Sequence, residues 1–548
     1  MKRRFFAYVS FILFMTVLSF SGIKGEDELL TVAESSHFTA TSRYADVLDF
    51  VRKLQGKSAL IRTETLCVSP EGRAVPLLII GNPPPSSPRT LNHDPRAVVY
   101  IQGNIHAGEV EGKEAALMLA RDILLDEKLP YLDQLVILIA PIFNADGNEK
   151  ISPDNRRNQV GPEKGVGVRY NGQNLDLNRD SMKLESPELQ GLVRNVLGRW
   201  DPALLVDLHT TNGSYHEEPV TYSWPLNPNG DLSIIAYMRD KMMPWINTNL
   251  QEKYRTLSVP YGNFTNYRDP EKGWRTFSHH PRFVTNYIGL RNRLAILDEN
   301  YSYADYKTRV FGCYSFLRSI LDYCALNKDE IMELLRQADQ NTIKRGMKPT
   351  AEDTFGTSFE VRPLEKPVTI RGYEMEILSK EGARPRVKRT ERKKTYTVPY
   401  FADFIPKESV QLPFAYLIPL NDPALEEKLL LHGLTVEKLT EAATLEVESF
   451  TIKEIKANPR LYQGHYMNSV SGEYVTQVRE FPTGTLCVGM AQPLANLAAY
   501  LLEAESDDGL LVWNFFDRYI TSQWGRRLLV YPVHRLLTPT NLVKETVR

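Results

Sequence analysis

Three side chains that can bind a metal ion follow short apolar runs of this sequence. His106 and Glu109 form an H-x-x-E motif just after the run 97–101, and His209 comes directly after the run 203–208. Two imidazoles and one carboxylate are the protein ligands of a zinc site that leaves its fourth coordination position open to water. The residue types and their positions therefore predict one zinc ion per chain, bound by His106, Glu109 and His209.

The position of the H-x-x-E motif is more informative than the motif itself. A chain with 10 histidines can contain such a short pattern by chance. Here it follows a predicted buried strand, and Gly103 and Gly108 allow the backbone to turn sharply beside an open cavity. The plainer alternatives are a hydrogen-bonded loop histidine for His106 and a core histidine at a strand end for His209.

The elements that would position these residues alternate between strand and helix. Continuous apolar strands separated by amphipathic helices predict a mostly parallel sheet with helices on both faces, and ligands bind beyond the carboxyl ends of such strands. Four polar residues follow strand ends and should meet at one edge of the sheet: His106, Asn144, His209 and Glu299. The predicted strands are 58–67, 74–80, 98–101, 135–141, 203–208 and 294–297, and the predicted helices include 44–54, 111–125, 186–198 and 303–327.

Glu299 ends the last of these strands and is the candidate general base. A carboxylate beside a reactive water can take its proton and deliver it to a leaving group, helped by a raised pKa in a partly dry cleft. Asp298 is the rival for this role. Because side chains alternate along a strand, the two carboxylates should lie on opposite faces, and we favour Glu299.

Asn178 and Arg179 lie side by side in a predicted loop between Glu109 and His209. An arginine next to an amide can hold a carboxylate by charge-assisted hydrogen bonds. Upstream, Arg156 and Arg157 add cationic donors suited to an oxyanion that develops during attack, and either of the two could serve. A solvated basic loop is the alternative for both arginines.

These motifs, in this order, resemble those of the zinc metallocarboxypeptidases of the carboxypeptidase A family over about residues 44–326. The resemblance implies a three-layer α/β/α sandwich with a mostly parallel mixed sheet. It also implies the role of each residue: His106, Glu109 and His209 as zinc ligands, Glu299 as general base, Asn178 and Arg179 as ligands of the substrate carboxylate, Arg157 as oxyanion donor, and Tyr287, or else Tyr261, as the family's mobile tyrosine.

The length of the chain predicts more than one domain, because 548 residues exceed what a single hydrophobic core usually spans. We predict a catalytic domain over 26–345, a β-rich linker or subdomain over 346–411, and a C-terminal accessory domain of β-rich α+β type over 412–548. With 66 basic and 67 acidic side chains, the chain has no overall field that would favour nucleic acid.

The first 25 residues read as a secretory signal peptide. Lys2, Arg3 and Arg4 precede the uncharged run 5–20, and small polar residues follow it. An uncleaved anchor is the alternative, but the run is somewhat shorter than the ~20 residues of a spanning helix. The mature protein should therefore be secreted or periplasmic, with no membrane span.

Signal and motifs together predict a secreted zinc metallocarboxypeptidase that hydrolyses the C-terminal peptide bond of peptides or proteins. Two alternatives stay open. An amidase or deacylase acting on acylated amino acids or cell-wall peptides would use the same ligands, and an inactive binding module would keep them without turnover. The binding module is disfavoured because ligands, base and carboxylate clamp are all present.

Overall fold

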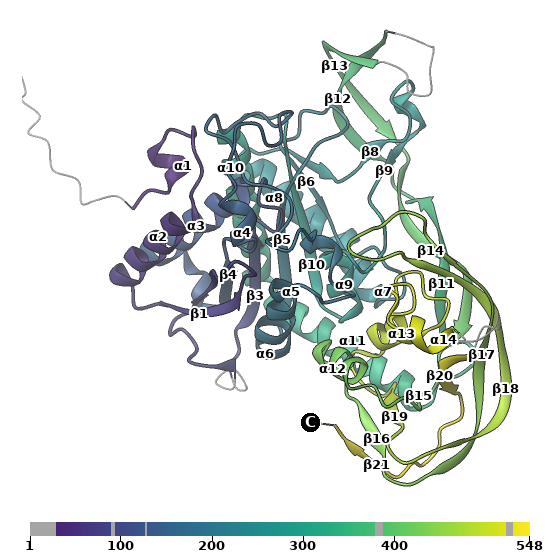
Figure 1. The fold of residues 1–548 in the computed structure, drawn as a ribbon. Coiled ribbons are helices and arrows are strands. Elements are labelled where there is room, and N and C mark those ends of the chain that lie inside the picture. The colour runs from purple at the N-terminus through teal and green to yellow at the C-terminus, as the bar shows by residue number, and fades with distance from the viewer. Residues whose placement is uncertain (1–28, 89–93, 127–128, 379–386, 522–529, 548) are drawn as a thin grey trace, which may run out of the picture.

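A sheet of eight strands forms the centre of the first half of the protein (Figure 1). The computed structural model describes residues 29–88, 94–126, 129–378, 387–521 and 530–547, so the predicted signal peptide lies outside the described residues. The strands lie in the order β1 (Ile61–Val68), β2 (Ala74–Ile80), β4 (Leu135–Ala140), β3 (Ala97–Gly103), β5 (Leu204–Thr211), β10 (Leu294–Tyr301), β6 (Val220–Ser223) and β7 (Ser258–Pro260).

The four central strands β4, β3, β5 and β10 are parallel, whereas β1 and β2 pair in antiparallel fashion with their neighbours. At the other edge, β6 is antiparallel to β10 and parallel to β7. The central strands are buried along nearly their whole length, as their continuous apolar runs predict. In the parallel pair β5 and β10, His209 lies opposite Glu299. The sheet is therefore the mixed, centrally parallel one expected from the sequence.

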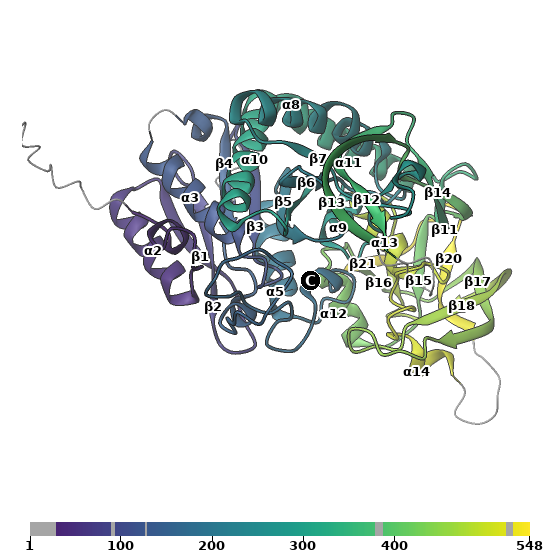
Figure 2. The same cartoon turned by 90° about the horizontal axis from the view of Figure 1, so that it is seen from above.

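Helices cover both faces of this sheet. Figure 2 shows α8 (Met243–Tyr254) and α10 (Tyr306–Leu326) on one side and α5 (Pro187–Gly191) on the other. The helix α3 (Glu111–Leu125) packs against α10 and against β5, where a Cβ on Gly112 would lie 2.5 Å from Cβ of Leu208. This close approach brings the start of α3, and with it the loop that carries His106 and Glu109, next to the end of β5.

The described residues between α11 (Lys328–Met347) and position 411 lie mostly in strands. A sheet in the order β11 (Thr354–Pro363), β14 (Tyr400–Gln411), β9 (Trp274–Arg275) and β8 (Asn263–Phe264) joins this segment to the first half of the chain, because β14 pairs with β9. A separate hairpin consists of β12 (Val368–Ile377) and β13 (Val387–Val398). The helices α2 (Tyr44–Lys57), α9 (Val284–Leu290) and α11 (Lys328–Met347) complete the long elements before β11.

The C-terminal part of the chain forms a further, antiparallel sheet accompanied by helices (Figure 1). One hydrophobic core includes both Tyr100 of β3 and Tyr416 of this sheet, so the two parts of the protein pack together. The strands lie in the order β18 (Asn468–Phe481), β17 (Ala443–Ala457), β20 (Val530–Leu536), β15 (Ala415–Ile418), β19 (Leu486–Gly489), β16 (Glu437–Leu439) and β21 (Lys544–Thr546), and the helices are α12 (Pro423–Leu431), α13 (Ala495–Leu502) and α14 (Asp517–Ile520).

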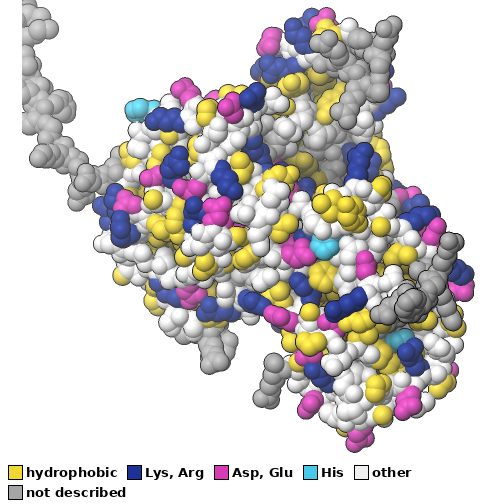
Figure 3. All heavy atoms as spheres, viewed as in Figure 1, with side chains coloured by type: hydrophobic (Ala, Val, Ile, Leu, Met, Phe, Trp, Pro, Cys, Tyr) yellow, Lys and Arg dark blue, Asp and Glu magenta, His cyan; other side chains and the backbone are white. Residues whose placement is uncertain are grey.

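The surface carries charges of both signs. On the face drawn in Figure 3, basic and acidic side chains are interspersed among hydrophobic ones, in keeping with the net charge of -1. Among the residues that the structure describes, no helix combines the length and the apolar character needed to cross a bilayer.

Candidate active site

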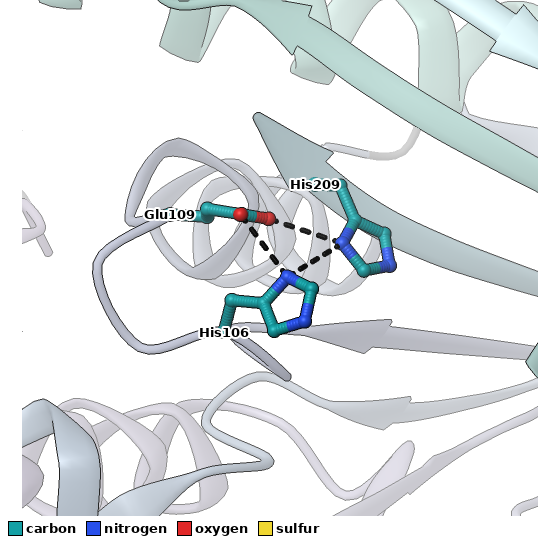
Figure 4. A group of neighbouring side chains, drawn as sticks. All are labelled: His106, Glu109 and His209. Carbon is teal, nitrogen blue, oxygen red and sulfur yellow. Dashed lines mark hydrogen bonds and ion pairs between the residues drawn. The ribbon is translucent and has the colours of Figure 1, made fainter. Parts of the chain in front are cut away.

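The three predicted metal ligands converge at the carboxyl edge of the central sheet (Figure 4). His106 and Glu109 come from the loop between β3 and α3, and His209 comes from β5. Nδ1 of His106 lies 3.0 Å from Oε1 of Glu109, Nδ1 of His209 lies 3.0 Å from Oε2 of the same carboxylate, and the two ring nitrogens are 3.2 Å apart. All three side chains are buried.

This arrangement fits a zinc ion. Tetrahedral zinc with bonds of about 2.0–2.1 Å to nitrogen and oxygen separates neighbouring ligand atoms by about 3.3 Å, close to the spacings seen here. The donor set of two imidazoles and one carboxylate is also one that zinc uses in catalytic sites. His106, Glu109 and His209 are therefore the residues that could hold the metal.

Each imidazole also pairs with a carboxylate through Nε2, the ring nitrogen that faces away from the cluster. Nε2 of His106 lies 2.9 Å from Oδ1 of Asp176, and Nε2 of His209 lies 2.7 Å from Oδ2 of Asp207. Such partners fix the ring and the tautomer that leaves the other nitrogen free for a metal. Both Nδ1 atoms are thus left to face the centre of the cluster.

The local backbone explains how the H-x-x-E loop adopts this shape. Asn104 has a left-handed φ of 68°, and its side-chain amide donates to the carbonyl oxygens of Ala107 and Glu109. A Cβ on Gly108 would lie 2.6 Å from Nε of Arg156. Only glycine lets the Arg156 side chain pass here, and its guanidinium then donates to Oε1 of Glu109.

The electrostatics of the cluster favour positive charge at its centre. Burial alone would raise the pKa of Glu109, but the Arg156 guanidinium and the imidazole of His106 outweigh it and hold that pKa well below its usual range. Burial alone would lower the pKa of His209, yet the carboxylates of Asp207 and Glu109 raise it well above its usual value. A cation at the centre would satisfy the same groups.

Glu299 faces the cluster from the neighbouring strand. It is half-buried in the cleft, and its Oε2 is enclosed without a hydrogen-bond partner among the described residues. Burial raises the pKa of Glu299 to about 8, with Glu109 adding to the shift and His209 opposing it. Asp298 is fully buried and receives a hydrogen bond from the amide of Asn300, and the cleft lining includes Glu299 but not Asp298.

A cleft of about 460 Å³ lies over the cluster, and the predicted carboxylate clamp lines it. Asn178 and Arg179 belong to the short 3-10 turn η3 (Leu177–Arg179), which Asp176 caps by accepting a hydrogen bond from the Asn178 backbone. The amide oxygen of Asn178 accepts from the backbone of Val284, and the Arg179 guanidinium lies 4.2 Å from the ring centre of Phe283. The clamp is thus held by the start of α9.

Arg156 and Arg157 both line the cleft but differ in their surroundings. Arg156 donates to Glu109, whereas the side chain of Arg157 is 77% exposed and pairs with Asp154 at 2.9 Å. The first therefore orients a candidate metal ligand, and the second has a guanidinium that can turn into the cleft.

The expectation for Tyr287 does not fit the structure. Tyr287 is 1% exposed, its hydroxyl lies 2.9 Å from Nδ1 of His432 in the C-terminal part, and it is not among the residues that line the cleft. It is a core residue between the two halves of the protein. Tyr261, the other candidate, does line the cleft, where burial raises its pKa.

Three residues with a part in this site carry no sequence signal of their own. Asp176 binds His106, Arg169 donates to Asp176 at 2.7 Å, and the side chain of Gln463 accepts a hydrogen bond from the Asp176 backbone at 2.8 Å. Asp176 comes 70 residues after its imidazole partner, and Gln463 comes 287 residues after Asp176. A sequence pattern limited to short spacings cannot pair them.

Known proteins resemble this chain in the same region. Residues 47–201 match the family model described as zinc carboxypeptidase. The matched segment contains His106, Glu109, Asn178 and Arg179 and ends before His209 and Glu299. The chain thus carries a zinc carboxypeptidase domain, and the resemblance predicted from the motifs is confirmed.

Named relatives agree with this class. Carboxypeptidase 2 of Trichophyton rubrum is 24% identical over 507 residues, which cover 86% of this chain and 84% of that protein. Carboxypeptidase 2 of Trichophyton equinum is 24% identical, with 85% of this chain and 81% of that protein covered. The solved carboxypeptidase A of Helicoverpa armigera is 16% identical and covers 53% of this chain and 75% of its own, with a TM-score of 0.38. The family match and the two carboxypeptidase 2 relatives support a metallocarboxypeptidase hydrolase.

Proposed function

We propose that this protein is a secreted zinc carboxypeptidase that removes the C-terminal residue from peptides or proteins. The observation that carries the proposal is the convergence of His106, Glu109 and His209 below a cleft that Glu299, Asn178 and Arg179 also line or border. The relatives named carboxypeptidase 2 support the reaction class. The N-terminal sequence pattern of basic, apolar and small residues supports secretion.

In this proposal, His106, Glu109 and His209 hold one zinc ion, and Asp176 and Asp207 orient the two imidazoles. The chemistry that a bound zinc ion supplies in such a site is acidification of a water molecule and polarisation of a carbonyl group. Arg156 keeps the Glu109 carboxylate ionised and correctly placed, because its guanidinium donates to Oε1. The protein's own contribution to the metal site is therefore rigid placement and charge balance.

Glu299 moves the proton. Its unpartnered Oε2 accepts a proton from the attacking water and later delivers it to the amine that leaves. Asn178 and Arg179 bind the free carboxylate of the substrate and so select the end of a chain. Arg157 turns from Asp154 toward the carbonyl oxygen as negative charge develops there, because the guanidinium of Arg156 is already bound to Glu109.

The proposal is tested with a peptide library that varies in its C-terminal residues, incubated with the enzyme with and without a chelator and read by mass spectrometry. The expected result is the loss of single residues from the C-terminus, abolished by the chelator and much slower for peptides with an amidated C-terminus. Cleavage of amidated or N-acylated compounds at an equal rate would point instead to an amidase or deacylase.

A further inference from the structure

A second group of metal-binding side chains lies outside the cleft. His279 and His280 come from the loop between β9 and α9, and Asp507 comes from the loop after α13, 228 residues later. Nε2 of His279 lies 2.8 Å from Oδ2 of Asp507, and Nε2 of His280 lies 3.5 Å from the same oxygen. Their ligand atoms all lie within 4.8 Å of one another.

The geometry points to a second zinc site, and we propose that His279, His280 and Asp507 bind a zinc ion that joins the catalytic domain to the C-terminal part. Two imidazoles and one carboxylate form a ligand set that suits zinc better than magnesium or calcium, which favour oxygen ligands. His280 and Asp507 also line a cavity of about 730 Å³, which leaves room for water at a remaining coordination position.

The orientation of the rings supports metal binding over a simple ion pair. The two imidazoles are stacked with their centres 4.5 Å apart and their planes 24° from parallel, and two imidazolium cations would repel each other in this arrangement. At least one ring is therefore neutral. Nδ1 of His280 bonds to the hydroxyl of Ser278, so when that nitrogen carries the proton, the lone pair of Nε2 faces Asp507.

One oxygen of the Asp507 carboxylate is shared by both rings, because Oδ2 lies near Nε2 of His279 and near Nε2 of His280. The other oxygen of Asp507 accepts a hydrogen bond from the hydroxyl of Tyr500, so Oδ2 is the oxygen left for the histidines.

The position of this site gives it a structural consequence. The loop that carries His279 and His280 also carries Phe277 and Phe283, which line the active-site cleft. A metal ion bound between this loop and Asp507 would hold the cleft wall against the C-terminal part. The second zinc is therefore a structural brace, distinct from the ion at His106, Glu109 and His209.

The test is a zinc titration of chelator-stripped full-length protein, read by a competing chromophoric chelator and by metal content. Wild type is expected to bind two zinc ions, and His280→Ala one. His465→Ala is the matched control, because His465 also pairs through Nε2 with a carboxylate, Glu185, at 2.8 Å, and no second imidazole of the described residues pairs with that carboxylate. This control should still bind two.

Each outcome decides between the alternatives. Two ions in both wild type and His280→Ala, or one ion in both, would overturn the second site. One ion in wild type and none in His280→Ala would support the second site. The same result would contradict zinc binding at His106, Glu109 and His209. If His280→Ala fails to fold by circular dichroism, the nearly isosteric Asp507→Asn is measured in its place, with the same expected loss of one ion.

Discussion

The two histidine–carboxylate clusters of this protein differ in what holds the far side of each imidazole. In the first cluster, Asp176 and Asp207 bind the outer nitrogens of His106 and His209. In the second, Nδ1 of His280 meets only a hydroxyl, that of Ser278, and Nδ1 of His279 is buried without a hydrogen-bond partner among the described residues. Ligand histidines with carboxylate partners bind zinc more tightly, typically by about 10- to 100-fold.

The clusters also differ in what lies beside them. Glu299 and the Asn178–Arg179 pair line the cleft over the first cluster, so a substrate can be bound and a proton moved there. The second lies between two parts of the chain, next to the cavity that Arg282 and Glu505 help to line. Similar ligands therefore serve chemistry in one place and attachment in the other, and the neighbours make the difference.

The largest expected effect comes from removing the proton carrier beside the first cluster. Glu299→Gln keeps the shape of the side chain but cannot accept the proton, so kcat should fall by about 10²- to 10⁴-fold. The zinc content should not change. The control is Asp298→Asn on the opposite face of the same strand, which should retain most of the activity. A greater loss of activity in this control than in Glu299→Gln would make Asp298 the general base.

The carboxylate clamp comes next. Arg179→Ala removes a charged partner of the substrate, and since hydrogen bonds to charged groups contribute about 1.5–3 kcal/mol, kcat/KM should fall by about 10- to 100-fold. Hydrolysis of a free-carboxylate peptide and its amidated twin is measured for both enzymes. The loss should be confined to the free peptide; an unchanged ratio between the two peptides would show that Arg179 does not read the carboxylate.

The third prediction compares the outer partners of the two clusters directly. Asp207→Asn should weaken zinc binding at the first site by about 10- to 100-fold. Ser278→Ala removes only a neutral hydrogen bond and should weaken the second site by about fivefold, the equivalent of ~1 kcal/mol. Competition with a chromophoric chelator resolves both constants, and equal losses would mean that the carboxylate partners do not distinguish the sites.

The smallest expected effect concerns the contact between the C-terminal part and the first cluster. Gln463→Ala leaves the backbone N–H of Asp176 without its partner, which should lower the free energy of unfolding by about 1 kcal/mol in urea. Gln337→Ala is the control, because Gln337 bonds to Glu333 on an exposed helix surface. Equal stability of the two variants would show that the hydrogen bond from the Asp176 backbone to Gln463 does not stabilise the protein.

Much of the fold and the convergence of His106, Glu109 and His209 were predictable because they depend on local patterns. Continuous apolar runs marked the central strands, and polar residues at the strand ends marked the site. The pairing of Asp207 with His209 has a sequence signal, because residues two positions apart along a strand lie on one face. The partners from distant segments were not predictable, since nothing in the spacing relates Asp176 to His106 or Gln463 to Asp176.

Tyr287 shows the opposite difficulty. A tyrosine close to the site residues in the sequence can face either the cleft or the core, and its position in the sequence does not decide between the two. The structure buries it against His432, a residue of the C-terminal part. The pairing of β14 with β9 is equally non-local, so the extent of contact between the two halves follows from the tertiary structure and not from the pattern of either segment.

The central claim is that the zinc ion used for hydrolysis is the one bound by His106, Glu109 and His209. The most direct measurement adds zinc stepwise to chelator-stripped enzyme and follows the release of the C-terminal residue from a free-carboxylate peptide. Activity should rise in proportion to zinc and reach its plateau at the first, tighter equivalent, with no rise in His106→Ala. Full activity in the stripped enzyme, or a rise that survives in His106→Ala, would contradict the account.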